Sequence, residues 1–195
     1  MMDNPANRKK LRPKDAKKRR RLSLVEFKLM RGYAEPWLRT AMDLALQSTQ
    51  AQLEVTRIRY SIKAPKAGVC GCVWHDTPQN EIYGVLYIHR KKVQAKESSH
   101  IAIPIGTELK RIIDESRDHI ASPYVVHRLP DKNSNPISQE VNHPTQIVPS
   151  YLSRAFSALR GSLGVAGKYS IDERPTFHEI RALAAHLFES QKVDP

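Results

Sequence analysis

The chain has 195 residues, of which 40% are hydrophobic and 27% are charged, a balance typical of a globular protein. The sequence holds no apolar run of 18 residues, which excludes a transmembrane helix, and no apolar segment follows the charged N-terminus as it would in a secretory signal. We therefore expect a soluble, cytoplasmic protein without a membrane partner.

The N-terminal segment is strongly basic. Residues 1–22 carry ten basic and two acidic side chains, so they hold +8 of the net charge of +12. Such a segment binds polyanions by releasing their condensed counterions, which indicates nucleic acid as the partner. The alternative is a solvated tail with no dedicated partner. We predict a disordered basic linker over residues 1–22 and one folded domain over residues 23–195.

Short helices are predicted at the start of this domain. A capping box of Ser23 and Glu26 opens the first helix. An apolar stripe predicts a second helix that ends near Ser48, and a third is expected over residues 51–59. Residues 60–80 contain two prolines and two glycines at Pro65, Gly68, Gly71 and Pro78, and they predict a loop or irregular insert.

In the middle of the chain the sequence pattern changes from helical spacing to β-rich runs, which predict a small sheet. The β-rich runs at residues 82–88 and 100–104 predict the two strands of a hairpin, whose tip is basic through Arg90, Lys91, Lys92 and Lys96. Helical spacing resumes at residues 105–118. After a strand-like run at 124–126 and a long loop at 129–149, further helices are predicted. These cover residues 151–163 and 176–190, the second with a capping box of Thr176 and Glu179. The fold class is α+β, mainly α, with a small antiparallel sheet.

Cys70 and Cys72 are the two cysteines of the chain, and His75 follows them closely. A structural zinc site needs four ligands, and no fourth ligand is evident here. Reduced thiols without a metal are the interpretation that the spacing favours.

The last predicted helix carries the most informative motif, His178-Glu-Ile-Arg181. In its sequence context it resembles the His-x-x-Arg box of lambdoid phage integrases, within the tyrosine recombinase family. Three more segments resemble that family in its order: residues 21–27 its opening helix, 37–46 its second helix, and 86–104 the hairpin that bears its catalytic lysine. The resemblance spans residues 20–195 and implies the catalytic domain of a tyrosine recombinase.

The resemblance gives the motif a chemical role. Residues three apart lie on one helix face, so His178 and Arg181 can converge on one anion, such as a scissile phosphodiester that gains negative charge during attack. In the family, a tyrosine attacks the DNA phosphate and a hairpin lysine acts as general acid. By position the lysine role falls to Lys92, with Lys91 as its neighbour. No metal or cofactor is implied. Taken alone, a His-x-x-Arg pair is more typical of a helix-end histidine and a surface arginine, and the surrounding resemblance is what favours the catalytic role. For Lys91 and Lys92 the alternative is a pair of solvated turn lysines.

Two departures from the family pattern set the expected activity. The family's first catalytic arginine follows its second helix, and the matching stretch here puts Ala51 in that position. The family's Leu-Gly-His segment and nucleophilic tyrosine come well after the His-x-x-Arg helix, whereas this chain ends at Pro195. We expect a domain that is incomplete at its C-terminus and has no recombinase activity by itself. The apolar stripe of its last helix should be partly exposed; it comprises Phe177, Ile180, Leu183, Ala184, Leu187 and Phe188.

The function implied is therefore that of a DNA-binding member of the phage integrase family, associated with the nucleoid of a bacterial cell. Its partners would be double-stranded DNA and other recombinase subunits. The residues expected to bind DNA are Arg19, Arg20, Arg21, Lys91, Lys92 and Arg154. Four alternatives remain: an inactive prophage remnant, a DNA-binding regulator, an enzyme whose tyrosine comes from a partner, and an RNA-binding protein. No aromatic stacking platform supports the last of these.

Overall fold

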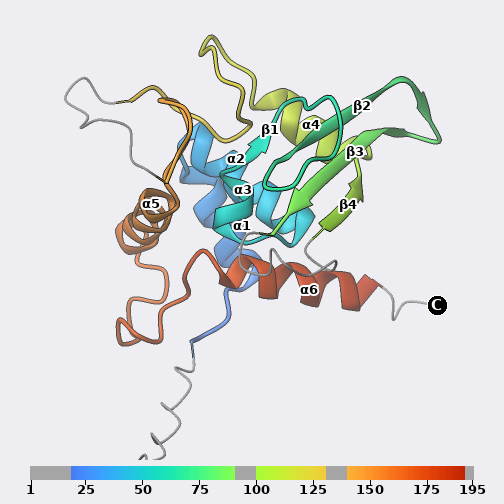
Figure 1. Ribbon diagram of the computed structural model, residues 1–195. Coiled ribbons are helices and arrows are strands. Elements are labelled where there is room, and N and C mark those ends of the chain that lie inside the picture. Colours follow the sequence, from blue (N-terminus) through green and yellow to red (C-terminus); the bar gives the residue numbers. More distant parts are fainter. Residues whose placement is uncertain (1–18, 91–99, 131–139, 192–195) are drawn as a thin grey trace, which may run out of the picture.

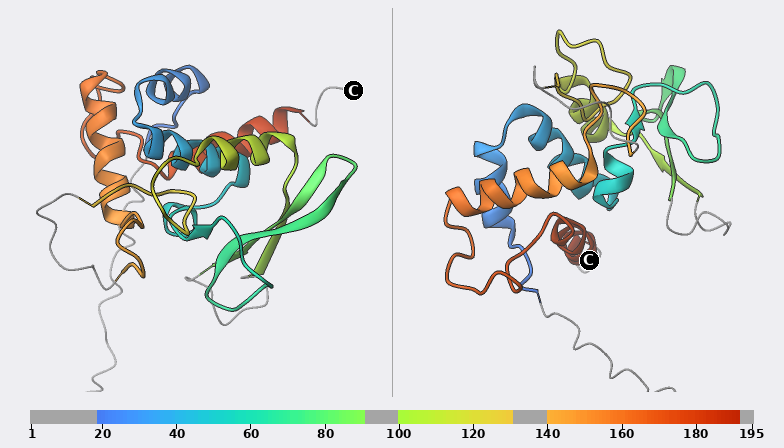
Figure 2. Two further views of the ribbon diagram at one scale, coloured as in Figure 1. Left: turned by 90° about the horizontal axis from the view of Figure 1, so that it is seen from above. Right: turned by 60° about the vertical axis from the view of Figure 1, so that its left-hand side comes forward.

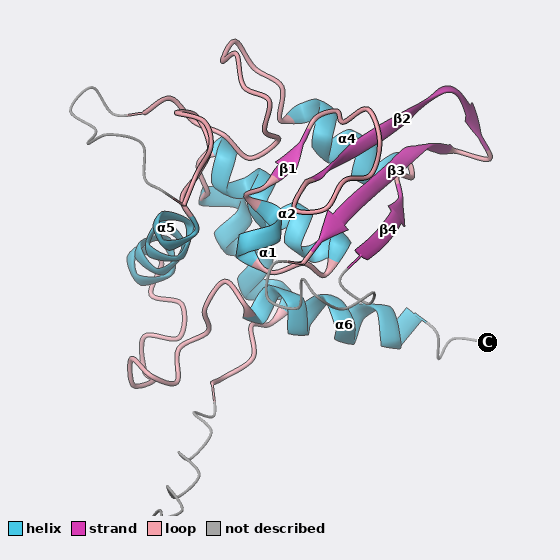
Figure 3. Ribbon diagram, viewed as in Figure 1, coloured by secondary structure: helices cyan, strands magenta, loops and turns pink. Residues whose placement is uncertain are grey.

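The computed structural model describes residues 19–90, 100–130 and 140–191 (Figure 1). The described helices are α1 (Leu24–Tyr33), α2 (Pro36–Ser48), α3 (Gln52–Val55), α4 (Thr107–Glu115), α5 (Pro149–Ser162) and α6 (Glu179–Gln191). The described strands are β1 (Ile58–Arg59), β2 (Cys70–Gln79), β3 (Ile82–His89) and β4 (His100–Pro104). The sheet lies to one side of the helices (Figure 3), so the predicted α+β class is confirmed. None of the described helices is long and apolar enough to cross a membrane.

Helix α2 lies at the centre of the domain. It contacts α1, α3, α4, α5 and α6, and the views in Figure 2 show it enclosed by them. Pro36 starts the helix, where a proline is tolerated because the first N–H groups have no partner within the helix. Apolar residues on more than one face allow this burial, since a helix that touches neighbours on several sides needs an apolar surface wider than one stripe. Its buried residues are Trp37, Leu38, Ala41, Met42, Asp43, Leu44, Ala45 and Ser48.

The predicted capping box of α1 is confirmed. The Ser23 hydroxyl accepts from the Glu26 backbone N–H at 3.2 Å, and the Glu26 carboxylate accepts from the Ser23 backbone N–H at 2.9 Å. Residues just before this box, which the sequence assigns to the linker, contact the domain. Leu22 is buried in the core, and the Arg20 backbone N–H donates to the Glu173 carbonyl at 2.8 Å.

The sheet has the strand order β1-β2-β3-β4. The first pair is parallel and the other two are antiparallel. The predicted strands at 82–88 and 100–104 are confirmed as β3 and β4, and they pair from Val85 with Pro104 to His89 with His100. The pairing of β2 with β3 requires glycine at position 84, because a Cβ atom there would lie 2.4 Å from the Val73 carbonyl oxygen.

Two predictions for the first half of the chain are wrong. Residues 70–79, expected to be a loop, form β2, whose start is buried while its end from His75 onward is exposed and polar. Glycine and proline within the segment hid a strand that is held by its partner β3 rather than by its own propensity. The third helix, expected over 51–59, ends at Val55, because the chain then enters β1 and pairs with β2.

The last helix also differs from expectation. It begins at Glu179 instead of Thr176. The Glu179 backbone N–H donates to the Thr176 carbonyl at 2.9 Å rather than to the Thr176 hydroxyl, which accepts from the Arg19 guanidinium at 3.0 Å. Because α6 packs against α2, most of its apolar stripe is covered: Phe177, Ile180, Leu183 and Ala184 are buried and Leu187 is partly buried. The expected exposed patch is reduced to Phe188, which is 43% exposed.

A bidentate ion pair joins α1 to α2. Arg31 Nε lies 2.6 Å and Arg31 Nη2 2.8 Å from the two carboxylate oxygens of Asp43. Burial raises the pKa of Asp43, and the hydrogen bonds from Arg31 oppose that rise. Without Arg31 the buried carboxylate would lose its hydrogen-bonded cation and keep only the weaker attraction of Arg111, so its folded-state pKa would rise further.

We predict that Arg31→Met lowers the free energy of unfolding at pH 7 by about 2 kcal/mol. Since the folded-state pKa of Asp43 should be higher in the variant than in the original protein, the variant gains more stability from protonation, and the loss should shrink as the pH falls from 7 toward 5. Urea unfolding at the two pH values measures this. The double variant Arg31→Met/Asp43→Leu should recover much of the loss, and a loss that does not depend on pH would contradict this role of Asp43.

Candidate functional site

A cavity of about 630 Å³ opens between the turn after α2, the end of β3, helix α5 and the start of α6. It brings together segments that are far apart in the sequence. Its lining residues are Arg19, Gln50, Ala51, Gln52, Leu53, Glu54, Arg90, Ser153, Ser157, Thr176, His178 and Arg181. The structure thus brings four residues that the sequence singled out to one cavity: Arg19, Ala51, His178 and Arg181.

The packing just before α6 positions His178. Phe177 is 2% exposed and its ring meets the Phe156 ring edge to face, with the centroids 5.7 Å apart. Arg160, itself buried on α5, donates from Nη1 to the Pro175 carbonyl at 2.5 Å. These contacts fix the backbone on both sides of Thr176, so that His178 is exposed at the cavity, one turn from Arg181.

Two further arginines enter the cavity from other parts of the chain. Arg19, which precedes α1, donates to the Thr176 hydroxyl at 3.0 Å. Arg90 follows β3 directly and donates from Nε to Gln50 Oε1 at 3.3 Å. Sequence reasoning treated Arg90 as part of a basic hairpin tip and did not single out Gln50. The one sequence signal for Arg90 was its position as a cation just after the predicted strand at 82–88.

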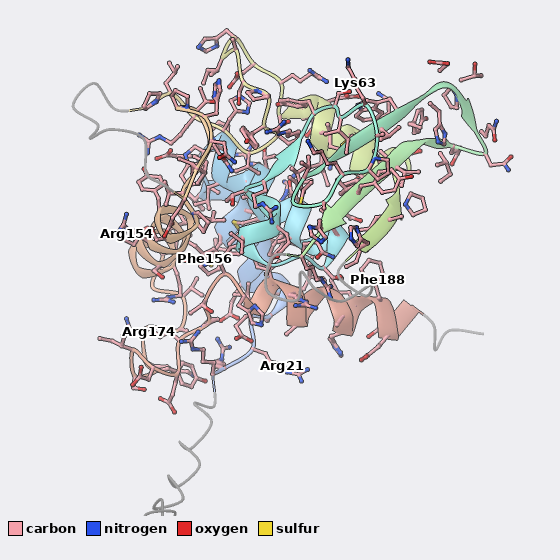
Figure 4. The ribbon with its side chains drawn as sticks, viewed as in Figure 1. Arg21, Lys63, Arg154, Phe156, Arg174 and Phe188 are labelled. Atoms are coloured by element: carbon pink, nitrogen blue, oxygen red, sulfur yellow. The ribbon has the colours of Figure 1, made fainter. Side chains whose placement is uncertain are left out.

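The other residues predicted to bind DNA lie elsewhere. Lys91 and Lys92 are outside the described residues. Arg20 pairs with Glu26 at 2.5 Å and its guanidinium lies 5.0 Å from the Tyr169 ring centre, so it is engaged within the domain. Arg21 is exposed beside a second cavity, and Arg154 is exposed on α5 without lining the first cavity (Figure 4).

The charge around the cavity is unbalanced. Three arginines line it, whereas Glu54 is the one carboxylate among its described lining residues. Outside the cavity, arginines such as Arg31 and Arg111 are paired with carboxylates. Within the described residues, the arginines of the cavity have no such ion pair, since Arg19 and Arg90 bond to a hydroxyl and an amide. An arrangement of this kind is suited to bind an anion such as a phosphate.

The two cysteines take no part in this site. Cys70 and Cys72 are buried, and burial raises the pKa of both thiols, that of Cys72 to about 12. A protonated thiol is a poor metal ligand, and His75 is exposed rather than buried with them. Across residues 19–90, 100–130 and 140–191, no group of three His, Cys, Asp or Glu side chains is arranged to hold a metal ion.

Known proteins resemble the chain along nearly its whole length, although no protein-family model matches it. The integrase of Enterobacteria phage P21 is 27% identical over 201 aligned positions, which cover 98% of this chain and 45% of that integrase. The prophage integrase IntE of Escherichia coli K12 is 26% identical, with the same two coverages. The chain therefore spans a little under half the length of these curated relatives.

Solved structures of lambda integrase share the fold. Its catalytic core superposes with a TM-score of 0.60 at 22% identity, and the match covers 90% of this chain and 90% of that core. A lambda integrase structure bound to DNA gives a TM-score of 0.58 and covers 89% of this chain and 52% of the other. The chain thus resembles phage integrases in sequence along nearly its whole length and shares the fold of the lambda integrase catalytic core.

Proposed function

We propose that the chain binds double-stranded DNA by holding a backbone phosphate in the cavity at the start of α6. The single observation that carries this proposal is the group of arginines there without a carboxylate partner among the described residues. Phosphate oxygens are strong acceptors for guanidinium groups, and His178 adds an imidazole at the same opening. We further propose that Arg21 and Arg154, both exposed, contact DNA outside the cavity.

The relatives support this proposal and suggest its setting. Lambda integrase has been solved as a dimer bound to a core site and as a tetramer bound to a Holliday junction. By analogy we propose that this chain binds DNA together with other recombinase subunits, as part of DNA integration and site-specific recombination. Its place of action would be the DNA of the bacterial nucleoid.

The proposed chemistry is binding without strand cleavage by these 195 residues alone. Covalent attack on a phosphodiester needs a nucleophile, and no tyrosine is among the described residues that line the cavity. Ala51 adds neither a charge nor a hydrogen-bond donor. Lys92, the proposed general acid, lies outside the described residues. A partner that supplies a tyrosine remains compatible with this proposal, as does a regulator that occupies particular sites.

The basic segment is proposed to add a separate, sequence-independent contribution to affinity. Residues 1–18 contain seven basic and two acidic side chains, and neutralising DNA phosphates releases counterions in proportion to the charges involved. We propose that the folded domain includes Arg20 and Leu22, which contact it among the described residues. The cavity and the segment should then differ in how strongly each depends on salt.

We predict that Arg181→Ala weakens binding to a duplex about tenfold, because it removes one charge-assisted contact to phosphate. The salt dependence should lose about one unit of slope. Fluorescence anisotropy over a salt series measures both quantities. Deleting residues 1–18 should reduce the slope much further yet leave binding at about 0.1 M salt. If the deletion abolishes binding and Arg181→Ala changes nothing, the cavity is not the DNA site.

We predict that the protein leaves a supercoiled plasmid supercoiled and forms no covalent adduct with it. Strand breaking and rejoining would relax the plasmid, but that reaction requires a nucleophile at the bound phosphate. Gel electrophoresis after protein denaturation detects both products, with a topoisomerase as the positive control. Relaxation that persists in a His178→Ala/Arg181→Ala variant would point to a contaminant, whereas relaxation lost in that variant would overturn the proposal of binding without cleavage.

A further inference from the structure

We infer that Arg90 is an anion ligand of the cavity and supplies the guanidinium that position 51 lacks, with Gln50 as the residue that positions it. This inference rests on the proposed function, in which the cavity holds a DNA phosphate. It assigns a binding role to a residue at the end of β3, a different element from the turn that bears Ala51.

The hydrogen bonds of Gln50 set the direction of the Arg90 side chain. Gln50 is 3% exposed, and its Nε2 donates to the Ser48 carbonyl at 2.8 Å. With its nitrogen used in this way, the amide presents Oε1 to Arg90 Nε at 3.3 Å. The guanidinium is held through Nε, and its two terminal nitrogens form no hydrogen bond with another described residue, so they can make a two-pronged contact with a phosphate.

The partner of Arg90 is neutral, and this preserves its positive charge. A carboxylate in the place of the Gln50 amide would form an ion pair and cancel most of the field that an anion senses. The protein uses such pairs elsewhere, as between Arg31 and Asp43 at 2.6 Å. In the described part of the chain, Arg90 has no comparable ion pair, and the cavity that it lines contains Glu54 as its one described carboxylate.

Other arginines near the turn after α2 are already engaged. Arg57 donates to the backbone carbonyls of His89 and Gly68, and Arg59 lies with its guanidinium 5.5 Å from the Tyr124 ring centre. Neither lines the cavity. Of these three arginines, Arg90, which directly follows β3, is therefore the one that lines the cavity together with Ala51.

Three substitutions test this assignment in the full chain by anisotropy with a fluorescent duplex. Arg90→Gln keeps a donor toward Gln50 and removes the charge. Gln50→Glu keeps the size of the side chain and neutralises Arg90 in place. Each should weaken binding at least fivefold at about 0.1 M salt, as loss of a charge-assisted phosphate contact does. Lys63→Gln removes one charge from the exposed loop before β2, far from α6 in Figure 4, and should change affinity less than twofold.

A relocation experiment separates position from net charge. Adding Ala51→Arg to Arg90→Gln should restore affinity to within about twofold of the original, because an arginine at 51 enters the same cavity. Adding Ser61→Arg, at an exposed position, restores the net charge without placing it in the cavity and should not. Rescue by Ala51→Arg that is no better than rescue by Ser61→Arg would overturn the inference.

The remaining outcomes distinguish this inference from the proposed function. If Arg181→Ala weakens binding while Arg90→Gln and Gln50→Glu do not, the cavity binds DNA and the role given to Arg90 is wrong. If Arg181→Ala, Arg90→Gln and Gln50→Glu all leave binding unchanged, the proposed function is wrong and this inference is wrong with it. Thermal denaturation checks that each variant folds, and Gln50→Glu carries the test if Arg90→Gln does not fold.

Discussion

The packing of α2 against each of the other described helices is the constraint on which the rest of the structure depends. This helix ends at Ser48, and Thr49 takes the left-handed conformation with φ 55°, which turns the chain sharply toward α3. Gln50 and Ala51 occupy that turn. Because α6 packs on the same helix, His178 and Arg181 are brought to face them. The cavity is thus a product of how α2 ends and what covers it.

Charge is distributed in two different ways in this protein. On and between α1, α2 and α4, arginines are paired with carboxylates, as Arg111 is with Glu108 and Glu115. Exposed pairs such as those of Arg111 contribute modestly to stability, and a paired arginine attracts an external anion less than an unpaired one does. Around the cavity the arginines bond to a hydroxyl and an amide. A surface that satisfies the geometry of its cations without neutralising them is suited to bind an anion.

Much of the fold could be predicted from local signals. The capping box at Ser23, the apolar stripe of α2 and the two β-rich runs each specify an element through adjacent residues. The strand at 70–79 could not be predicted, because its glycine and proline disfavour a strand and its pairing with β3 is a tertiary property. For the same reason the sequence predicts an exposed apolar face on α6, because the cover that α2 provides depends on the packed structure.

The residues of the candidate site also divide into those that a local motif predicts and those that only the folded structure brings together. His178 and Arg181 were found because they are close together in a motif. Arg90 and Gln50 are 40 residues apart, and their hydrogen bond follows from the meeting of β3 with the turn after α2. With Arg90 in the cavity, Ala51 is a weaker objection to an enzyme completed by a partner, since the anion could be held without an arginine at that position.

The construction of the cavity from distant segments also links binding to folding. Residues from before α1, the turn after α2, the end of β3, α5 and α6 must all be docked before an anion can be held. Any opening that separates α6 from α2 would disperse this set, so an anion bound in the proposed site would stabilise the closed state by mass action. Binding at the cavity and the joint exchange of the amide hydrogens of α2 and α6 with solvent would then be linked.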